Sequence, residues 1–423
     1  MKKKIVIIPI LLCFAFANIG CGGKQRTGST DDPQERNDTD TVAGPSVPSD
    51  TVAVKPNSAT LLFDASGSMH GYLNTSDSRF VGVISSFENI PNSINIRMYG
   101  TSEGEPIEST EFDNMLSNRN INWSNESDLK AMVQSMINHV KTDDVCFLIT
   151  DGILSGSNAQ IKSSPDRSYN IRQREKMSND LSAMMNGKAG KLSALIVRYN
   201  ATFNGTYSCY NNDGKKLTNK ERPFYVIALG KWCYIKYLED VLKEGKEQKG
   251  ISTSFEDMVM IGDNLSYKQL KLSPSKGINP KDGKLVIKQG KGNDLITLSA
   301  NIRCLPSYMQ TEDYFKSNLE LLVQHSGQSL KDLEKYEISV ISEKGKPKLK
   351  IDIKPGTLVN SKLVFRLKHS LPDWIETKSD DNDLDIATNP FKLNKTFNLK
   401  YFIAGFGTLH DGKYIKEQTM EFK

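Results

Sequence analysis

The stretch ATLLFDASGSM, residues 59–69, decides the fold. Its first five residues are apolar or β-branched and predict a buried strand that ends at Asp64. Ser66 and Ser68 follow at alternate positions, so a segment that is extended and then turns can aim three side-chain oxygens into one space. In open α/β sheets, ligands bind beyond the carboxyl ends of the strands. We therefore expect Asp64, Ser66 and Ser68 to form part of a binding site.

A second strand of the same kind is VCFLITDG, residues 145–152. Its continuous apolar run is typical of a central strand in a parallel sheet. Asp151 stands directly after the run, and Gly152 permits the tight turn that follows. Two neighbouring strands that each end in an Asp bring two carboxylates to one edge of the sheet. Carboxylate and hydroxyl oxygens suit a hard divalent cation, with Mg²⁺ as the default ion.

Helix-like and strand-like segments alternate between residues 58 and 250. Apolar residues at helical spacing predict helices, and short apolar runs predict strands. The predicted helices cover residues 79–90, 129–140, 167–185 and 232–242, and further predicted strands cover residues 94–99, 192–199 and 224–229. This alternation predicts a doubly wound, Rossmann-like α/β domain.

Together, the two strand ends resemble the metal ion-dependent adhesion site (MIDAS) of von Willebrand factor type A (vWA) domains. In that family one strand ends in Asp-x-Ser-x-Ser, a loop supplies a Thr, and another strand ends in Thr-Asp-Gly. The resemblance covers residues 58–250, somewhat under half of the chain. The metal ligands that it implies are Asp64, Ser66, Ser68, Ser127 and Asp151. It also implies that a carboxylate of a protein partner fills the open coordination position of the metal ion.

Ser127 is the point at which the chain departs from the family. The family often has Gly-Gly-Thr just before the helix that starts here near Leu129, whereas this chain keeps only a Ser hydroxyl. The same hydroxyl suits the N-cap of that helix. The alternative to a working site is a vWA-like fold with a decayed one. Asp64 would then cap the segment that follows it, and Asp151 would shape an Asp-Gly turn.

The pattern changes after residue 250 to short strand-like runs between loops rich in Gly, Pro, Asn and Lys. We expect two β-rich, sandwich-like modules over residues 251–335 and 336–423, with a helix over residues 312–323 in the first. Residues 396–403 are expected to form a strand of the second module. The acidic cluster at residues 380–385 lacks the spaced Gly and the final Glu of a calcium-binding EF-hand loop, so a solvated loop is expected there.

The N-terminus has the layout of an export signal over residues 1–20. A basic start (residues 2–4) precedes an apolar run (residues 5–16) that is too short to span a bilayer. Cys21 follows the small residue Gly20 and resembles the lipidated cysteine of a bacterial lipobox, although Asn18 stands where Leu is usual. This resemblance implies an acyl (palmitate-type) anchor on Cys21. The alternative is a plain secretory signal with an incidental cysteine. Residues 21–57 are polar and small, and predict a flexible tether.

The remaining cysteines suggest two different roles. Cys146 lies inside an apolar strand and is expected to be a buried small hydrophobe. Cys209 and Cys233 flank one strand–loop unit and could form a disulfide in an exported chain.

Composition limits the function. The net charge is only +5 and the folded region has no block of Lys and Arg, which argues against nucleic-acid binding. No Gly-x-Ser-x-Gly motif and no zinc-type His spacing occur, so we do not expect an enzyme, and a hydrolase is the least favoured function. The leading hypothesis is a protein of the bacterial cell envelope, lipid-anchored in the outer membrane, that binds an acidic group on a protein partner through Mg²⁺. The alternative is a metal-indifferent structural or assembly factor of an envelope complex.

Overall fold

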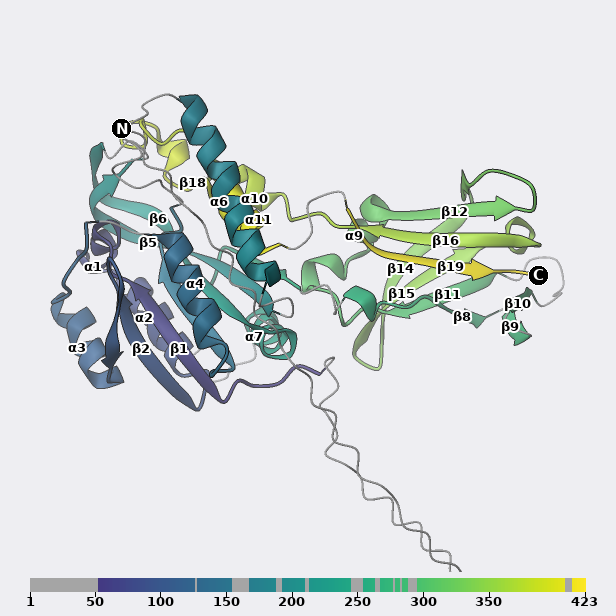
Figure 1. Cartoon of the computed structure of the whole chain (residues 1–423), viewed down its shortest axis with the longest axis horizontal. Helices are drawn as coiled ribbons and strands as arrows, with labels where there is room; N and C mark the ends of the chain where they lie inside the picture. The colour runs from purple at the N-terminus through teal and green to yellow at the C-terminus, as the bar shows by residue number, and fades with distance from the viewer. Residues whose placement is uncertain are drawn as a thin grey trace, which may run out of the picture. The chain divides into compact units, whose positions relative to one another are not determined.

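The computed structural model describes residues 52–125, 128–153, 167–187, 192–209, 213–244, 254–262, 267–276, 278–281, 284–287, 295–407 and 413–423 (Figure 1). The chain divides into residues 1–47 and residues 48–423, and every described residue belongs to the second unit. The predicted signal segment, Cys21 and most of the predicted tether therefore lie outside the described residues.

A seven-stranded sheet with helices on both faces forms the first part of the structure. Its strands stand in the order β3-β2-β1-β4-β6-β5-β7. The strand bounds are β1 Ser58–Asp64, β2 Ser93–Tyr99, β3 Glu103–Ile107, β4 Val145–Thr150, β5 Leu192–Ser208, β6 Gly214–Lys231 and β7 Asp257–Ile261. The helices are η1 Gly67–Met69, α1 His70–Leu73, α2 Arg79–Glu88, α3 Ser109–Asn118, α4 Leu129–His139, α6 Arg167–Gly187 and α7 Trp232–Glu244. The predicted α/β class is confirmed.

The sheet is mixed rather than parallel throughout. β1 runs parallel to both β2 and β4, and we call these three strands the parallel half. The edge strand β3 is antiparallel to β2 and belongs to neither half. β6 is antiparallel to β4, and β5 is antiparallel to both β6 and β7; these three strands are the antiparallel half. The parallel strand pairing of the doubly wound sheet expected over residues 58–250 is found only among β1, β2 and β4. β5 and β6 are long strands joined by a short connection, which leaves no room for the crossover helix that parallel strands require.

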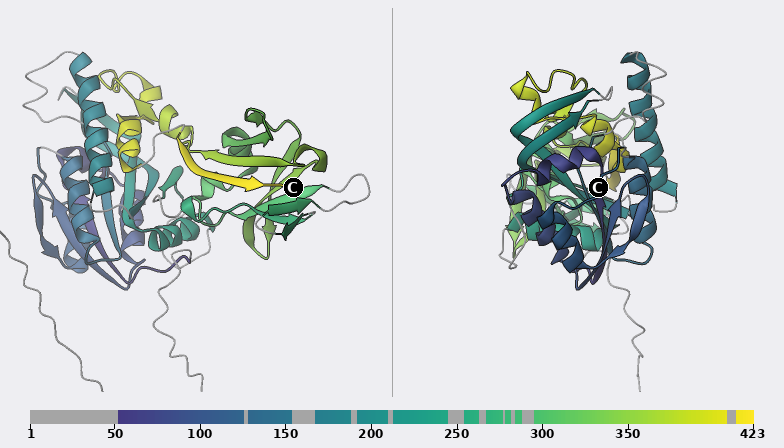
Figure 2. Two further views of the ribbon diagram at one scale, coloured as in Figure 1. Left: turned by 45° about the vertical axis from the view of Figure 1, so that its right-hand side comes forward. Right: turned by 90° about the vertical axis from the view of Figure 1, so that its left-hand side faces the viewer.

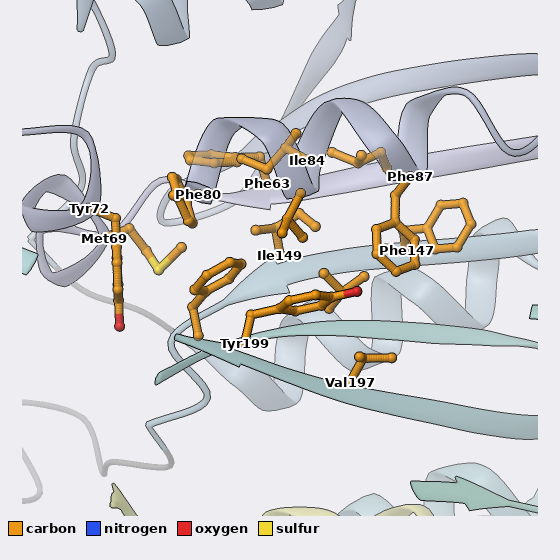
Figure 3. Close-up of a cluster of buried hydrophobic side chains, with 14 of the residues drawn as sticks. Phe63, Met69, Tyr72, Phe80, Ile84, Phe87, Phe147, Ile149, Val197 and Tyr199 are labelled. Carbon is orange, nitrogen blue, oxygen red and sulfur yellow. The ribbon is translucent and has the colours of Figure 1, made fainter. Parts of the chain in front are cut away.

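Each face of the sheet has its own hydrophobic core. On one face, Phe63 and Phe147 pack with side chains of α2, α3 and α7, including Phe80 and Phe87 (Figure 3). On the other face, Leu62 packs with side chains of α4 and α6. Successive residues of a strand point to opposite faces, so a strand covered on both sides must be apolar at every position. This is why residues 59–63 form an unbroken buried run.

Two four-stranded antiparallel sheets follow, in the orders β14-β15-β11-β8 and β13-β12-β16-β19. The strand bounds are β8 Ser273–Lys276, β11 Ile296–Asn301, β12 Leu319–His325, β13 Lys331–Asp332, β14 Tyr336–Glu343, β15 Lys346–Ile353, β16 Ser361–Lys368 and β19 Tyr414–Glu421. β9 Ile278–Lys281 and β10 Lys284–Ile287 pair as a separate hairpin. Leu298 and Ile351 of one sheet share a core with Phe365 of the other. The expectation of β-rich structure after residue 250 is confirmed, and the pairing within these two sheets is antiparallel.

The helix expected over residues 312–323 is wrong in its second half. α9 covers only Glu312–Asn318, and Leu319 begins β12, which pairs with β16 along its whole length. Two short helical turns, η2 Ser307–Met309 and η3 Pro355–Thr357, lie in the same part of the chain. Residues 319–323 pair with β16 instead of continuing the helix, so strand pairing in the folded protein overrides the local helical preference.

Residues 371–407, here called the return segment, leave the β-rich part and pack on the seven-stranded sheet and its helices (Figure 1 and Figure 2). They contain α10 Trp374–Thr377, β17 Ser379–Asp380, η4 Pro390–Lys392, β18 Thr396–Phe397 and α11 Leu399–Phe406. Phe402 and Phe406 of α11 join the same core as Leu181 and Met185 of α6. The strand expected over residues 396–403 is confirmed only at Thr396–Phe397 and is wrong from Leu399, where α11 begins, and the module expected over residues 336–423 is interrupted by this segment.

The predictions for two of the cysteines have clear outcomes. Cys146 is fully buried in β4, as expected. Cys209 is a free thiol whose Sγ lies 3.4 Å from the carbonyl oxygen of Asp383, so the disulfide with Cys233 is not formed. No helix in the described ranges is both long enough and apolar enough to cross a bilayer.

Candidate metal site

The register of β1 and β4 brings the two predicted strand ends together. These strands are parallel neighbours in which Phe63 pairs with Ile149. Asp64 is the last residue of β1, and Thr150 is the last residue of β4. The side chains of Asp64 and Asp151 therefore emerge at one edge of the sheet, as the sequence predicts. Asp64 is fully buried and Asp151 is 5% exposed.

The loop after β1 is fixed by hydrogen bonds within itself. Oδ1 of Asp64 accepts a hydrogen bond from the backbone N–H of Ser66 at 3.0 Å. The hydroxyl oxygens of Ser66 and Ser68 lie 3.1 Å apart. Met69 then turns into the core beneath the loop, which anchors it (Figure 3). The three predicted oxygen donors of this loop are thus held close together.

Thr150 has a role that the sequence analysis missed. Its hydroxyl donates to Oδ2 of Asp64 at 2.8 Å, so it joins the end of β4 to the end of β1. The same hydroxyl oxygen accepts a hydrogen bond from the backbone N–H of Gly152 at 3.2 Å. Thr150 therefore positions the Asp64 carboxylate. The signal that could have identified it is its place directly before Asp151.

The turn after Asp151 requires a glycine. Oδ1 of Asp151 accepts a hydrogen bond from the N–H of Ile153 at 3.2 Å. Gly152 has a φ of +69°, which L-residues rarely adopt, and a Cβ placed on it would lie 2.7 Å from the ring of Tyr225. The predicted Asp-Gly turn is therefore present, and it packs directly against β6.

The electrostatics of the edge are dominated by two buried carboxylates. Burial and the nearby charge of Asp151 raise the pKa of Asp64 to about 7, against hydrogen bonds from Ser66 and Thr150. Burial also raises the pKa of Asp151, against the hydrogen bond from Ser68 and the positive charge of Arg222. Two buried like charges repel each other, and a divalent cation bound at them relieves both the repulsion and the loss of hydration. The donor set of two carboxylates and two hydroxyls fits Mg²⁺.

Ser127 lies outside the described residues, so its predicted part in the metal site stays a prediction. The other role suggested for Ser127, the N-cap of the following helix, is filled by the next residue. The N-cap of α4 is Asp128, whose side chain accepts a hydrogen bond from the N–H of Ala131 at 3.0 Å. The loop before α4 also approaches the site at Ser124, which pairs with Ser66 in an isolated parallel bridge. Sequence spacing gave no signal for Ser124.

A buried arginine from the antiparallel half completes the surroundings. Arg222 of β6 is 1% exposed and stacks over the ring of Tyr207, with 4.7 Å from Cζ to the ring centroid. Its charge acts on Asp151, as the pKa of that carboxyl shows. The sequence analysis did not single it out, because an Arg in a strand is normally read as a surface residue.

The acidic cluster at residues 380–385 is not the fully solvated loop that we expected. Asp383 is 1% exposed and accepts a hydrogen bond from the hydroxyl of Tyr207 at 2.8 Å. Asp380 and Asp385 both face the ammonium group of Lys392, at 3.6 and 2.6 Å. Throughout the described ranges, no three or more His, Cys, Asp or Glu side chains are grouped so that they could share a metal ion. The candidate metal site supplies only two such side chains, because its other oxygens are hydroxyls.

No protein-family model matches the chain, and comparisons with curated proteins and with solved structures gave no significant match. The function of the candidate metal site is therefore inferred from its residues and their chemistry.

Proposed function

We propose that the chain is a binding protein of the bacterial cell envelope that grips an acidic group on a protein partner through Mg²⁺. The domain that does this is proposed to be of the vWA type, and the metal site a MIDAS. The proposed metal ligands are Asp64, Ser66, Ser68, Ser127 and Asp151. A lipid on Cys21 is proposed to hold the protein at the outer membrane, with residues 21–57 as a tether.

The observation that carries this proposal is the pair of buried carboxylates at adjacent strand ends. Asp64 and Asp151 are both nearly inaccessible to solvent, and each raises the electrostatic penalty of ionising the other. A proton or a cation must balance such a pair, and a divalent cation does so with both carboxylates ionised. Hydroxyls of Ser66 and Ser68, 3.1 Å apart, lie beside the pair and add neutral oxygen donors.

The choice of an acidic group on the partner follows from charge. Neutral hydroxyl ligands reduce the positive charge of a bound cation less than further carboxylates would. A cation held in this way retains affinity for an anionic ligand, and a carboxylate from a partner forms a strong, partly desolvated contact with it. The chemistry supplied by the bound Mg²⁺ is therefore recognition of a carboxylate.

The proposal is tested by measuring Mg²⁺ and Mn²⁺ binding to the purified chain and to its Asp64→Asn variant. Asn keeps the shape of the side chain and can still accept the hydrogen bond from the N–H of Ser66, but it removes the charge. In roughly a hundredfold excess over its Kd, Mg²⁺ should stabilise the wild type by about 2.7 kcal/mol. The variant should show no such gain in thermal melts and no heat in titration calorimetry.

The matched control is Asp332→Asn, which removes an exposed carboxylate on β13. This control should bind and respond to Mg²⁺ as the wild type does. A wild-type chain that binds neither cation would contradict the proposal. Partner binding that persists in EDTA would favour the metal-indifferent assembly factor instead.

A further inference from the structure

One aromatic side chain of the return segment is almost fully exposed to solvent. Phe391 of η4 is 84% exposed, whereas Val52, the next most exposed large hydrophobic side chain of the described ranges, is 50% exposed. Phe391 stands in the connection between β17 and β18, residues 381–395, which we call the 381–395 loop. Aromatic side chains that remain exposed are common anchors of protein interfaces.

The backbone under Phe391 is held by two buried arginines from the antiparallel half. Nη1 of Arg222 donates to the carbonyl oxygens of Lys392, Leu393 and Lys395, at 3.3, 2.8 and 2.9 Å. Nη2 of Arg198 donates to the carbonyl oxygen of Asn394 at 3.2 Å. Both arginines are 1% exposed. The guanidinium groups of both arginines are thus hydrogen-bonded to the backbone of this loop, so the loop conformation is strongly specified.

Local contacts fix the tip of the loop as well. The side-chain oxygen of Asn389 accepts a hydrogen bond from the N–H of Phe391 at 3.2 Å. The ammonium group of Lys392 is paired with Asp385 at 2.6 Å and is hydrogen-bonded to the carbonyl oxygen of Asn382. Phe391 is thus presented on a preorganised backbone, which reduces the entropy lost when a partner binds.

The loop lies next to the candidate metal site. The ring of Tyr225 packs against Gly152 so closely that a Cβ added to this glycine would lie 2.7 Å from the ring. The hydroxyl of the same tyrosine lies 2.8 Å from the hydroxyl of Thr396, the first residue after the loop. One side chain therefore separates the end of the loop from the turn that follows Asp151.

We propose that Phe391 and the candidate metal site belong to one binding surface. The partner that fits it is a protein with a surface carboxylate beside an apolar pocket, the carboxylate for the metal and the pocket for Phe391. This inference rests on the proposed function and adds the feature of the partner that sets its specificity.

The charge of the 381–395 loop favours a protein over a membrane surface as the occupant. The loop carries Asp381, Asp383 and Asp385 against Lys392 and Lys395. The side chains of Asp381 and Asp385 are 46% and 48% exposed. Asp381 is paired with Arg174 and Asp385 with Lys392, so the loop presents no basic segment of the kind that anionic lipid headgroups attract.

The test uses synthetic peptides with one central Asp, flanked in one set by Leu and Phe and in the other set by Ser and Gly. Their affinities are measured by fluorescence polarisation in millimolar Mg²⁺ for the wild type and for Phe391→Ser. The wild type should bind the apolar set at least about tenfold more tightly, as expected for a central aromatic anchor. Phe391→Ser should lose this preference and keep its Mg²⁺-dependent binding of the polar set.

The matched control is Val359→Ser, which removes another exposed apolar side chain, 47% exposed, from the β-rich part. It should behave as the wild type. A Phe391→Ser variant that keeps the preference overturns the inference but leaves the proposed function standing. A wild type that binds no peptide set in a Mg²⁺-dependent manner overturns both.

Two further measurements separate the remaining outcomes. Slow hydrogen exchange of the amides of residues 392–395 in the free protein supports a preorganised loop, and fast exchange contradicts it. Sedimentation with vesicles of phosphatidylethanolamine and phosphatidylglycerol should show no dependence on Phe391. Vesicle binding that is lost in Phe391→Ser would assign the side chain to the membrane and overturn the inference.

Discussion

The two halves of the seven-stranded sheet are built on different principles. In the parallel half, β1 and β4 are short, apolar at almost every position and covered on both faces. In the antiparallel half, β5 and β6 are much longer than β1 and β4, and they carry the buried Arg198 and Arg222. The parallel half presents two carboxylates at its edge, and the antiparallel half holds the loop beside that edge. The candidate site therefore depends on both halves, although only one of them supplies the proposed metal ligands.

Among the changes that test this comparison, Arg222→Met is expected to lower the free energy of unfolding most. Met fills a similar space but removes the hydrogen bonds that Arg222 donates to three part-buried carbonyl oxygens of the 381–395 loop, and the loss of donors to such groups is destabilising. We expect a loss of about 3 kcal/mol of unfolding free energy in urea titrations, and faster proteolytic cleavage within the loop.

Lys220→Met provides the matched control, because Lys220 is exposed on the same strand. This change should leave both stability and cleavage close to those of the wild type. If Arg222→Met is no less stable than this control, the antiparallel half does not hold the loop in the way described.

A smaller effect is expected from Gly152→Ala in the parallel half. The new Cβ would meet the ring of Tyr225, and the residue would keep an unfavourable φ of +69°. We expect a loss of about 2 kcal/mol in the same urea titration. Gly327→Ala tests the φ contribution alone, because Gly327 has a φ of +77° with no atom within 4 Å of the added Cβ. Equal losses in the two variants would show that the contact with Tyr225 is not tight.

The smallest effect concerns α2, which covers the parallel half. Burial and the charge of Asp113 raise the pKa of Glu88 to about 7, and its Oε1 has no hydrogen-bond partner within the described ranges. The folded protein therefore holds this proton more tightly than the unfolded chain, so stability from Glu88 is present at low pH. It is lost as the pH rises from about 4.5 to 7.

Glu88→Gln should therefore raise stability by about 1 kcal/mol above pH 7, and by less at pH 4. Because Glu88 is partly exposed, this figure is smaller than the full pKa shift would suggest. Thermal melts at the two pH values measure the difference. Glu108→Gln, at an exposed position, is the control. A gain that is the same at both pH values would show that the ionisation of Glu88 is not its cause.

The parallel half could be predicted from the sequence because its signals are local. Each strand is a short apolar run followed at once by an Asp, and the amphipathic pattern of α2 and α4 is regular. Asp64 and Asp151 then meet because parallel strands end at the same edge. Thr150 could have been added to the site from its position alone.

The antiparallel half and the return segment could not be predicted in the same way. The apolar runs 192–199 and 224–229 mark only the first part of β5 and the last part of β6, because the rest of each strand has polar residues between its apolar ones. Leu399, Phe402, Ile403 and Phe406 follow helical spacing. The strand-like pattern of residues 396–403 nevertheless favoured a strand. What decides for the helix is burial against α6, a contact more than two hundred residues away in sequence.

Because of the return segment, the two cores of the seven-stranded sheet can be completed only after the last part of the chain has been synthesised. Side chains from the last fifty-odd residues, such as Phe402 and Ile386, complete cores that the first two hundred described residues begin. A nascent chain that has not reached residue 371 must keep Arg222 and the apolar face of α6 without their final partners. The contacts of the 381–395 loop with Arg222 therefore form late, after the strands that carry Asp64 and Asp151, so a prematurely terminated chain cannot present the proposed binding surface.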